Sequence, residues 1–235
     1  TKPFLLVFFA NNINKRTIPL MAIPVILIFI QPSLGVSFLL SLGFIGVLLA
    51  SEIKKINFLY LAVGAMVIIP VVFSLLAPYQ KSRIVSFINP YSDPKGAGYN
   101  SIQSQIAVGG GGLSGRGLGK GVQTQLSFLP ESETDFIFAA ISEELGFLGS
   151  GLILIALFIL FWRITAFMGS AVSPQARAYL AGIFTMLLSQ TIIHVGMNMG
   201  LLPITGIPLP LVSAGGSSFV STMIALGIAL GARRR

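Results

Sequence analysis

The sequence predicts an all-α polytopic membrane protein, a multi-span helical bundle with one large extracytoplasmic loop. Of its 235 residues, 54% are hydrophobic and only 9% are charged, and the mean hydropathy is +0.89. Soluble domains carry about 25% charged residues, so this composition excludes a disordered chain, a soluble enzyme core and a nucleic-acid-binding module. The charges are also unevenly placed, because 11 of the 22 lie between Tyr79 and Glu144. The absence of Cys excludes a disulfide framework and a cysteine nucleophile.

The first 78 residues predict transmembrane helices, of which the first is partial. Thr1–Ala10 is apolar but too short to cross a bilayer, so we expect it to be the end of a helix that starts upstream. Thr17–Ala50 is too long for one span, and Gln31-Pro32 interrupts it. This favours a hairpin of two short helices over a single kinked helix. Asn57–Ala77 has 21 residues, about 31 Å as a helix, which matches the core of a bilayer.

Residues 136–235 predict the C-terminal transmembrane helices. The expected spans are Leu145–Trp162, Ala178–Gly200 and Leu211–Ala232. Basic residues follow the positive-inside rule if the C-terminal arginines are cytoplasmic. The residues that then share this side are Lys15, Arg16, Lys54, Lys55, Arg163, Arg177, Arg233, Arg234 and Arg235. The alternation of the spans therefore places residues 79–135 outside the cell membrane.

Residues 79–135 form a connection far longer than is usual between helices, and such connections are often functional. Aromatic and apolar residues occur throughout this segment, so we expect it to pack and to carry the chemistry. Within it, Gly109–Gly121 holds eight glycines in thirteen residues. No strand precedes this run, which excludes a dinucleotide-binding fingerprint. Two interpretations remain open: a backbone cradle for a phosphate or diphosphate that uses Arg116 and Lys120, or a hinge loop.

Asp135 is the acid that the sequence singles out, because it directly precedes the apolar run Phe136–Ile141. Desolvation at a membrane boundary raises the pKa of a carboxyl, which suits a general base or a proton relay. Alternatively, Thr134 or Asp135 caps the helix that follows, and the two interpretations are compatible. His194, the only histidine, is expected to be a hydrogen-bonded packing residue rather than a metal or proton site.

Two long blocks of this sequence closely resemble the SEDS family (shape, elongation, division and sporulation proteins, including RodA, FtsW and SpoVE). The first is NPYSDPKGAGYNSIQSQIAVGGGGLSGRGLGKGVQTQLSFLPESETDFIFAAISEELGFLG and the second is GLLPITGIPLPLVSAGGSS. The blocks GAGYNSIQSQIA, QTQLSFLPE and LLPITGIPLPL are closer to the RodA, elongation branch than to the FtsW, division branch. The family has about ten spans, so the resemblance implies that roughly three are absent or partial here.

The resemblance implies an inverting peptidoglycan glycosyltransferase that polymerises lipid II in cell elongation, shape maintenance or division. Its active site would lie on the outer face of the bacterial cytoplasmic (inner) membrane. Asp135 matches the family's essential aspartate and would be the base. The substrate-binding residues that the resemblance and the charge pattern imply are Lys2, Arg116, Lys120, Glu131, Ser217 and Ser218.

Lys2, Arg116 and Lys120 would neutralise the diphosphate leaving group, with a divalent cation, Mg²⁺ or Mn²⁺, as a candidate to assist them. No organic cofactor is expected. The implied partners are a class B penicillin-binding protein, lipid II, polyprenyl diphosphate and membrane lipids, with no nucleic acid. Two alternative functions stay open. One is a flippase (transporter) for lipid-linked precursors, favoured by spans that Gly and Pro interrupt, and the other is a non-catalytic scaffold for a penicillin-binding protein.

Overall fold

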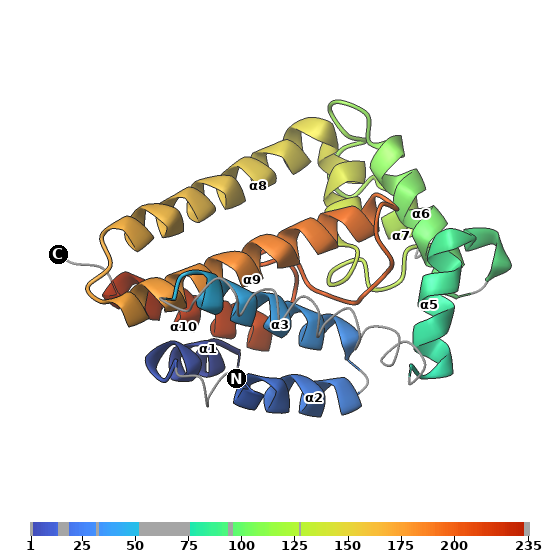
Figure 1. The fold of residues 1–235 in the computed structure, drawn as a ribbon. Coiled ribbons are helices and arrows are strands. Elements are labelled where there is room, and N and C mark those ends of the chain that lie inside the picture. Colours follow the sequence, from blue (N-terminus) through green and yellow to red (C-terminus); the bar gives the residue numbers. More distant parts are fainter. Residues whose placement is uncertain are drawn as a thin grey trace.

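Helices dominate the protein, as the sequence predicts (Figure 1). In this computed structural model, the structure describes residues 2–13, 19–31, 33–51, 76–93, 96–126 and 128–232, and no strand occurs among them. The α-helices are α1 (Lys2–Asn11), α2 (Ala22–Ile30), α3 (Leu34–Leu49), α5 (Pro78–Ile88), α6 (Ala97–Gly110), α7 (Val122–Gln125), α8 (Ile137–Gly169), α9 (Pro174–Asn198) and α10 (Gly216–Gly231). Two short 3₁₀-helices, η1 (Pro19–Met21) and η2 (Pro90–Ser92), complete the described elements.

The predicted helical hairpin is confirmed. α2 ends at Ile30, Gln31 has an extended backbone (φ −70°, ψ 136°), and α3 then returns along α2 (Figure 1). The extended conformation of Gln31 follows from the sequence, because a residue before proline is disfavoured in the α region. The span expected at residues 57–77 lies almost entirely outside the described residues.

α8 and α9 are long and apolar enough to cross a membrane, and they contain most of the spans predicted at 145–162 and 178–200. Their surroundings differ. The most apolar window of α9 is 61% buried, whereas that of α8 is only 22% buried although its mean hydropathy is higher, 2.4 against 1.5. α9 is therefore the central helix of the bundle, and α8 exposes an apolar face along its length.

Small residues let α3 approach α9 closely. A Cβ added to Gly46 would lie 2.7 Å from the backbone oxygen of Ala181, and one added to Gly182 would lie 2.5 Å from the side chain of Val47. Leu6 of α1 packs over the same region, since its Cδ2 would lie 3.2 Å from a Cβ on Gly43. Close contact through glycine is a common way to pack helices in a membrane.

The last helix begins later than expected, at Gly216 rather than Leu211. Residues 201–215 are not helical because Pro208 and Pro210 lack a backbone donor and Leu211 has a positive φ of 63°. This segment instead runs back along α9: Gln190 Nε2 donates to the Pro208 carbonyl at 2.7 Å, and His194 Nδ1 lies 2.7 Å from the Ile207 carbonyl oxygen. The hydrogen-bonded packing role expected for His194 is thus confirmed.

The helices give the bundle two distinct ends. At one end, Ala50 and residues 169–174 line a common pocket with Arg177, and Val172 N–H donates to the Ala232 carbonyl at 3.1 Å. α5, α6 and α7 gather at the opposite end (Figure 1). The segment that precedes α8 and the segment that follows α9 meet there, so Asp135 lies at this second end.

Candidate active site

The acidic turn, residues 131–136, is a tight turn built around one carbonyl. The backbone N–H groups of Thr134, Asp135 and Phe136 all donate to the Glu131 carbonyl, at 3.1, 3.1 and 3.2 Å. Glu131 itself has a positive φ of 51°, which is uncommon for a residue with a side chain. Such a conformation persists only where surrounding contacts fix it. The turn is therefore held from outside, by residues far along the sequence.

Asn198, the last residue of α9, is fully buried and supplies the central contact. Its Nδ2 donates to the backbone carbonyl of Asp135 at 3.1 Å and to that of His194 at 2.8 Å. Its Oδ1 accepts from Ala139 N–H at 3.1 Å. Ala139 is the third residue of α8, whose N–H has no partner within the helix. Asn198 therefore caps α8 from another helix and fixes the backbone of Asp135 with the same side chain.

A second polar contact holds the turn from the α10 side. Ser213 Oγ donates to the Thr134 carbonyl at 2.8 Å and accepts from Leu209 N–H at 2.7 Å. Ala214 N–H donates to the Glu133 carbonyl at 2.8 Å. The acidic turn is thus held on two sides, by α9 and by the segment that precedes α10.

The helix-capping interpretation of Thr134 and Asp135 is wrong. The residue at the N-cap position of α8 is Phe136, and no side-chain capping bond is made by it. Thr134 Oγ1 donates to the Glu131 carboxylate at 3.1 Å instead. Because Asn198 supplies the cap, the carboxylate of Asp135 makes no hydrogen bond to the described part of the chain and is available to a ligand.

Gly206 and Arg83 are the neighbours of that carboxylate. A Cβ added to Gly206, whose φ is +68°, would lie 3.4 Å from Asp135 Oδ2 and 3.9 Å from Arg83 Nη1. Because Gly206 has no side chain, the Asp135 carboxylate and the Arg83 guanidinium face a common space beside it. Burial and the nearby Glu131 raise the pKa of Asp135 above its ordinary value, and Arg83 offsets part of this rise.

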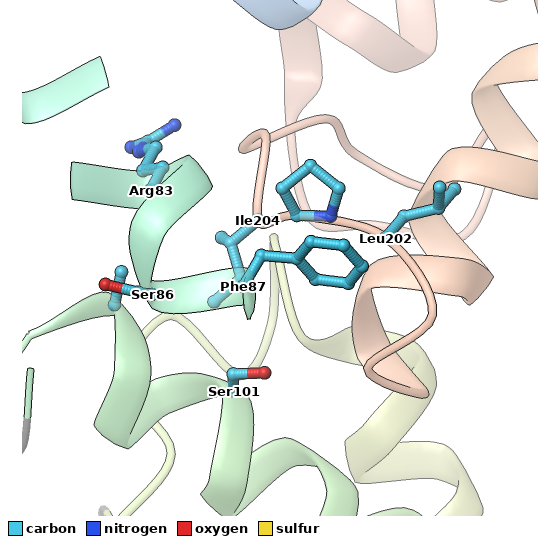
Figure 2. Close-up of a pocket in the computed structure, with 8 residues that line it drawn as sticks. Arg83, Ser86, Phe87, Ser101, Leu202 and Ile204 are labelled. Carbon is cyan, nitrogen blue, oxygen red and sulfur yellow. The ribbon is translucent and has the colours of Figure 1, made fainter. Parts of the chain in front are cut away.

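α5 carries Arg83 into this position by docking on the segment after α9. Figure 2 shows Arg83 and Phe87 on α5 around a small pocket with Ser101 of α6 and with Leu202 and Ile204. The ring of Phe87 lies beside the 202–204 segment. The apolar contacts of the pocket thus hold the helix whose cation faces Asp135.

The glycine-rich loop fills a break in α8. Gly146 has non-helical angles (φ 68°, ψ −164°), which leaves backbone groups on either side of it without partners in the helix. Phe147 and Leu148 N–H donate to the carbonyls of Gly112 and Leu113, at 2.9 and 3.1 Å. In the other direction, Arg116 and Gly117 N–H donate to the carbonyls of Glu143 and Glu144, at 2.9 and 3.0 Å.

Glu143 holds the end of the same loop. Its buried carboxylate accepts from the N–H groups of Gln123 and Thr124, at 3.0 and 3.3 Å, and so caps the short helix α7. With this cap and the contacts at Gly146, the N–H groups of Arg116 and Gly117 already have protein acceptors. They are therefore not free to form the backbone cradle considered above, although the side chains of Arg116 and Lys120 are exposed.

The residues predicted for the site fall into four groups. Glu131 lies in the same turn as Asp135. Ser217 and Ser218 lie in the first turn of α10, close after Ala214, which contacts the turn. Arg116 and Lys120 lie beside the break in α8, roughly 10 Å from the start of α8 along the helix. Lys2 begins α1, which packs on α3, α9 and α10, and no described contact joins it to Asp135.

The described residues offer a divalent metal two carboxylates at most. No group of three His, Asp or Glu side chains that could hold a metal occurs in the described ranges. Asp135 and Glu131 are close enough to influence one another, and Mg²⁺ is often held by one or two carboxylates together with substrate phosphates. Glu131 and the phosphates of the substrate would hold such an ion, which leaves Asp135 free to accept a proton, and we assign no chemical step to the ion.

Sequence reasoning missed Asn198, Ser213, Arg83 and Glu143. Asn198 lies at the end of a predicted span, where an amide is unremarkable by position. Its 63-residue separation from Asp135 gives no local signal. Glu143 carried one usable signal, because a carboxylate inside an apolar stretch needs partners.

Comparisons with known proteins agree on one family. The family model described as "Cell cycle protein", for FtsW, RodA and SpoVE, matches residues 8–235. Peptidoglycan glycosyltransferase MrdB of Escherichia coli K12 is 42% identical over 215 residues, which cover 90% of this chain and 57% of the relative. Stage V sporulation protein E of Bacillus subtilis is 40% identical over 210 residues, which cover 89% of this chain and 57% of the relative. The chain thus spans little more than half the length of these relatives.

Solved structures share the fold. A chain from a study of the structural coordination of polymerization and crosslinking by a peptidoglycan synthase complex superposes with a TM-score of 0.78 at 27% identity, covering 97% of this chain and 67% of that one. A mutant of the rod shape determining protein RodA from Thermus thermophilus superposes with a TM-score of 0.63 at 24% identity, covering 97% of this chain and 62% of that one. The second comparison supports the fold alone.

The role of Asn198 leads to a stability prediction. Asn198→Ala removes the acceptor of Ala139 N–H and the donor to the Asp135 carbonyl. Because these groups are buried, we expect a loss of about 2–4 kcal/mol in unfolding free energy. Thermal unfolding of the purified protein in detergent should show a clearly lower Tm.

Asp135→Asn is the matched control for that measurement. Folding raises the pKa of Asp135, so the protonated carboxyl favours the folded state. This contribution to the free energy of unfolding is lost as the pH rises through the raised pKa, and the ionised carboxylate then destabilises the folded state at neutral pH. A neutral amide should therefore leave the Tm unchanged or raise it. A wild-type Tm for Asn198→Ala would contradict the capping role.

Proposed function

Since the chain belongs to the FtsW, RodA and SpoVE family of cell cycle proteins, we propose that it is part of a peptidoglycan glycosyltransferase. The protein polymerises lipid II into glycan strands, in the manner of the RodA branch. The names of its relatives support this, since those that match over most of this chain include peptidoglycan glycosyltransferases. It is a multi-pass membrane protein, and lipid-linked substrates reach it through the bilayer.

The observation that carries the proposal is the state of Asp135. Its backbone is fixed by Asn198, its carboxylate has no hydrogen-bond partner in the described part of the chain, and Arg83 faces it across Gly206. A carboxylate that serves only structure would be expected to have a partner. One with a fixed backbone, an open side chain and a raised pKa has the properties of a general base.

The reaction joins the 4-hydroxyl of an acceptor sugar to the anomeric carbon of a donor. As the new C–O bond forms, the bond from the anomeric carbon to the lipid diphosphate breaks, and its electron pair leaves with the diphosphate. The proton of the hydroxyl passes to Asp135. The raised pKa favours this transfer, because a base is most effective when its pKa lies near the working pH.

The negative charge of the leaving diphosphate needs nearby cations to stabilise it. These cations must lie close to Asp135 without occupying its carboxylate, which has to accept the proton. Arg83 is the described cation nearest to that carboxylate, and we add it to the residues that bind the diphosphate. Ser217 and Ser218 begin α10, and a helix N-terminus attracts anions. Lys2, Arg116, Lys120 and Glu131, with Mg²⁺ or Mn²⁺ as an assisting ion, keep the substrate-binding roles that the family resemblance implies.

The acidic turn faces the outside of the inner membrane, and the C-terminus is cytoplasmic. The contacts that gather Ala50, Arg177 and Ala232 at one end of the bundle support this, since short connections that carry basic residues are cytoplasmic, whereas long connections cross largely regardless of their charge. A class B penicillin-binding protein is the proposed partner. The similarity to a chain from a peptidoglycan synthase complex of polymerization and crosslinking supports that assignment.

Asp135→Asn tests the function. We expect the full-length variant to fold, to keep its transpeptidase partner and to bind lipid II, yet to lose about 10²–10⁴ in polymerisation rate. The measurement is the formation of glycan chains from lipid II by the purified complex. Glu133→Gln is the control, because Glu133 is exposed and its backbone carbonyl, not its side chain, makes the contact to Ala214.

The same preparations decide between the proposed functions. Wild-type protein that flips lipid II in vesicles but makes no chains would indicate a transporter. Polymerisation by Asp135→Asn near the wild-type rate would move the role of base to another residue, with Glu131 as the nearest acid in the turn.

A second prediction concerns orientation. Reporters inserted after Gly112 and fused after Arg235 should lie on opposite sides of the membrane, outside and cytoplasmic respectively, because three spans separate them. Paired alkaline phosphatase and fluorescent-protein fusions measure this. Two reporters on the same side would overturn the orientation.

A further inference from the structure

We propose that the glycine-rich loop, residues 111–120, is a membrane anchor that inserts two leucines into the lipid leaflet at the α5–α7 end. Leu113 and Leu118 are among the most exposed large apolar side chains of the described residues, at 74% and 73%. Side chains of this size at the tip of a polar, glycine-rich loop are not explained by packing within the chain. Exposed apolar side chains indicate a binding surface where they form a continuous patch.

The loop is continuous with the uncovered apolar face of α8. The backbone bonds at the Gly146 break place Gly112 beside Phe147 and Leu113 beside Leu148. Phe147 and Leu148 are themselves 69% and 68% exposed, at the start of the span whose apolar window is only 22% buried. The exposed leucines thus extend a surface that the length and hydropathy of α8 assign to lipid.

The position and charge of the loop fit the interface of a bilayer. In Figure 1 the loop between α6 and α7 projects beyond the kinked end of α8, away from α9. It carries Arg116 and Lys120, both exposed, and no acid. Apolar side chains flanked by basic ones are the pattern of segments that lie in the headgroup region and attract anionic lipids. We therefore assign anionic phospholipid as the partner of this surface.

Docking into the break of α8 fixes the depth of the loop. Four backbone hydrogen bonds tie residues 112–117 to residues 143–148, so Leu113 is held beside the start of the span, and Leu118 directly follows the tied segment. Gly146 and Gly115 approach so closely that a Cβ on Gly146 would meet the Gly115 nitrogen. The glycines therefore serve this close docking, and the loop presents the leucines at a set height on the membrane.

The test is a fluorescence depth measurement. Because this chain has no Cys, a single introduced cysteine is its one site for labelling. Leu118→Cys is labelled with a polarity-sensitive dye in the full-length protein, after any cysteine outside this chain is replaced. The protein is reconstituted in vesicles of phosphatidylcholine and phosphatidylglycerol, in which one lipid or the other carries the nitroxide. Phe158→Cys, an exposed position midway along α8, is the lipid control, and Tyr91→Cys, 83% exposed on η2, is the aqueous control.

We expect the label at 118 to behave like the label at 158: quenched by lipid-attached nitroxide, shielded from aqueous iodide and blue-shifted relative to the label at 91. At equal nitroxide content, quenching should be stronger when the nitroxide is carried by phosphatidylglycerol than when it is carried by phosphatidylcholine, because the basic side chains gather the anionic lipid beside the loop. Iodide quenching equal to that at 91 would overturn the proposal, and so would shielding from both quenchers, the result for a loop covered by a partner protein. Equal quenching by the two nitroxide-bearing lipids would overturn the pairing with anionic headgroups. None of these readouts depends on glycan synthesis, so they are independent of the proposed enzyme activity.

Discussion

The buried N-terminus of α8 needs hydrogen-bond acceptors, and this need determines how the α5–α7 end of the molecule is arranged. The first N–H groups of α8 have no partners in the helix, and its start is buried among other helices. Asn198 meets this need from the end of α9, and its amide simultaneously holds the Asp135 carbonyl. Ser104 of α6 donates to the Asn198 carbonyl at 2.8 Å, so three helices converge on this one residue. The arrangement of α6, α8 and α9 therefore fixes the acidic turn.

The same constraint explains why Asp135 is chemically available. An acid at a helix start usually stabilises that start through its own carboxylate. Here the amide from α9 does so, and the carboxylate faces Arg83 across a glycine. Glu143 repeats the device at α7, where a side chain from α8 caps another helix. Caps that one helix supplies to another thus join the connection formed by residues 79–135 to the predicted membrane spans. They give this otherwise irregular segment a defined position.

Periodic and local features were predictable from the sequence. The hairpin around Gln31, the spans in α8 and α9, and the position of Asp135 before an apolar helix all follow from hydropathy, proline placement and charge. The cap at Asn198, the docking of residues 112–117 into the break at Gly146 and the approach of Arg83 were not predictable. Each depends on residues far apart in sequence, which only the packed helices bring together. The late start of α10 was missed because an apolar run does not by itself distinguish a helix from an extended segment whose carbonyls bind Gln190 and His194.

The pH dependence of glycan synthesis tests most directly whether Asp135 is the base. Single-turnover polymerisation by the full-length complex should show an acidic limb above the ordinary carboxyl pKa of about 4, because burial and Glu131 raise the pKa of Asp135. Arg83→Gln removes the cation that lowers this pKa, so the limb should move to higher pH, while Lys81→Gln, a neutralisation on the same helix, should leave it in place. A limb that Arg83→Gln leaves unchanged or moves to lower pH would contradict the assignment.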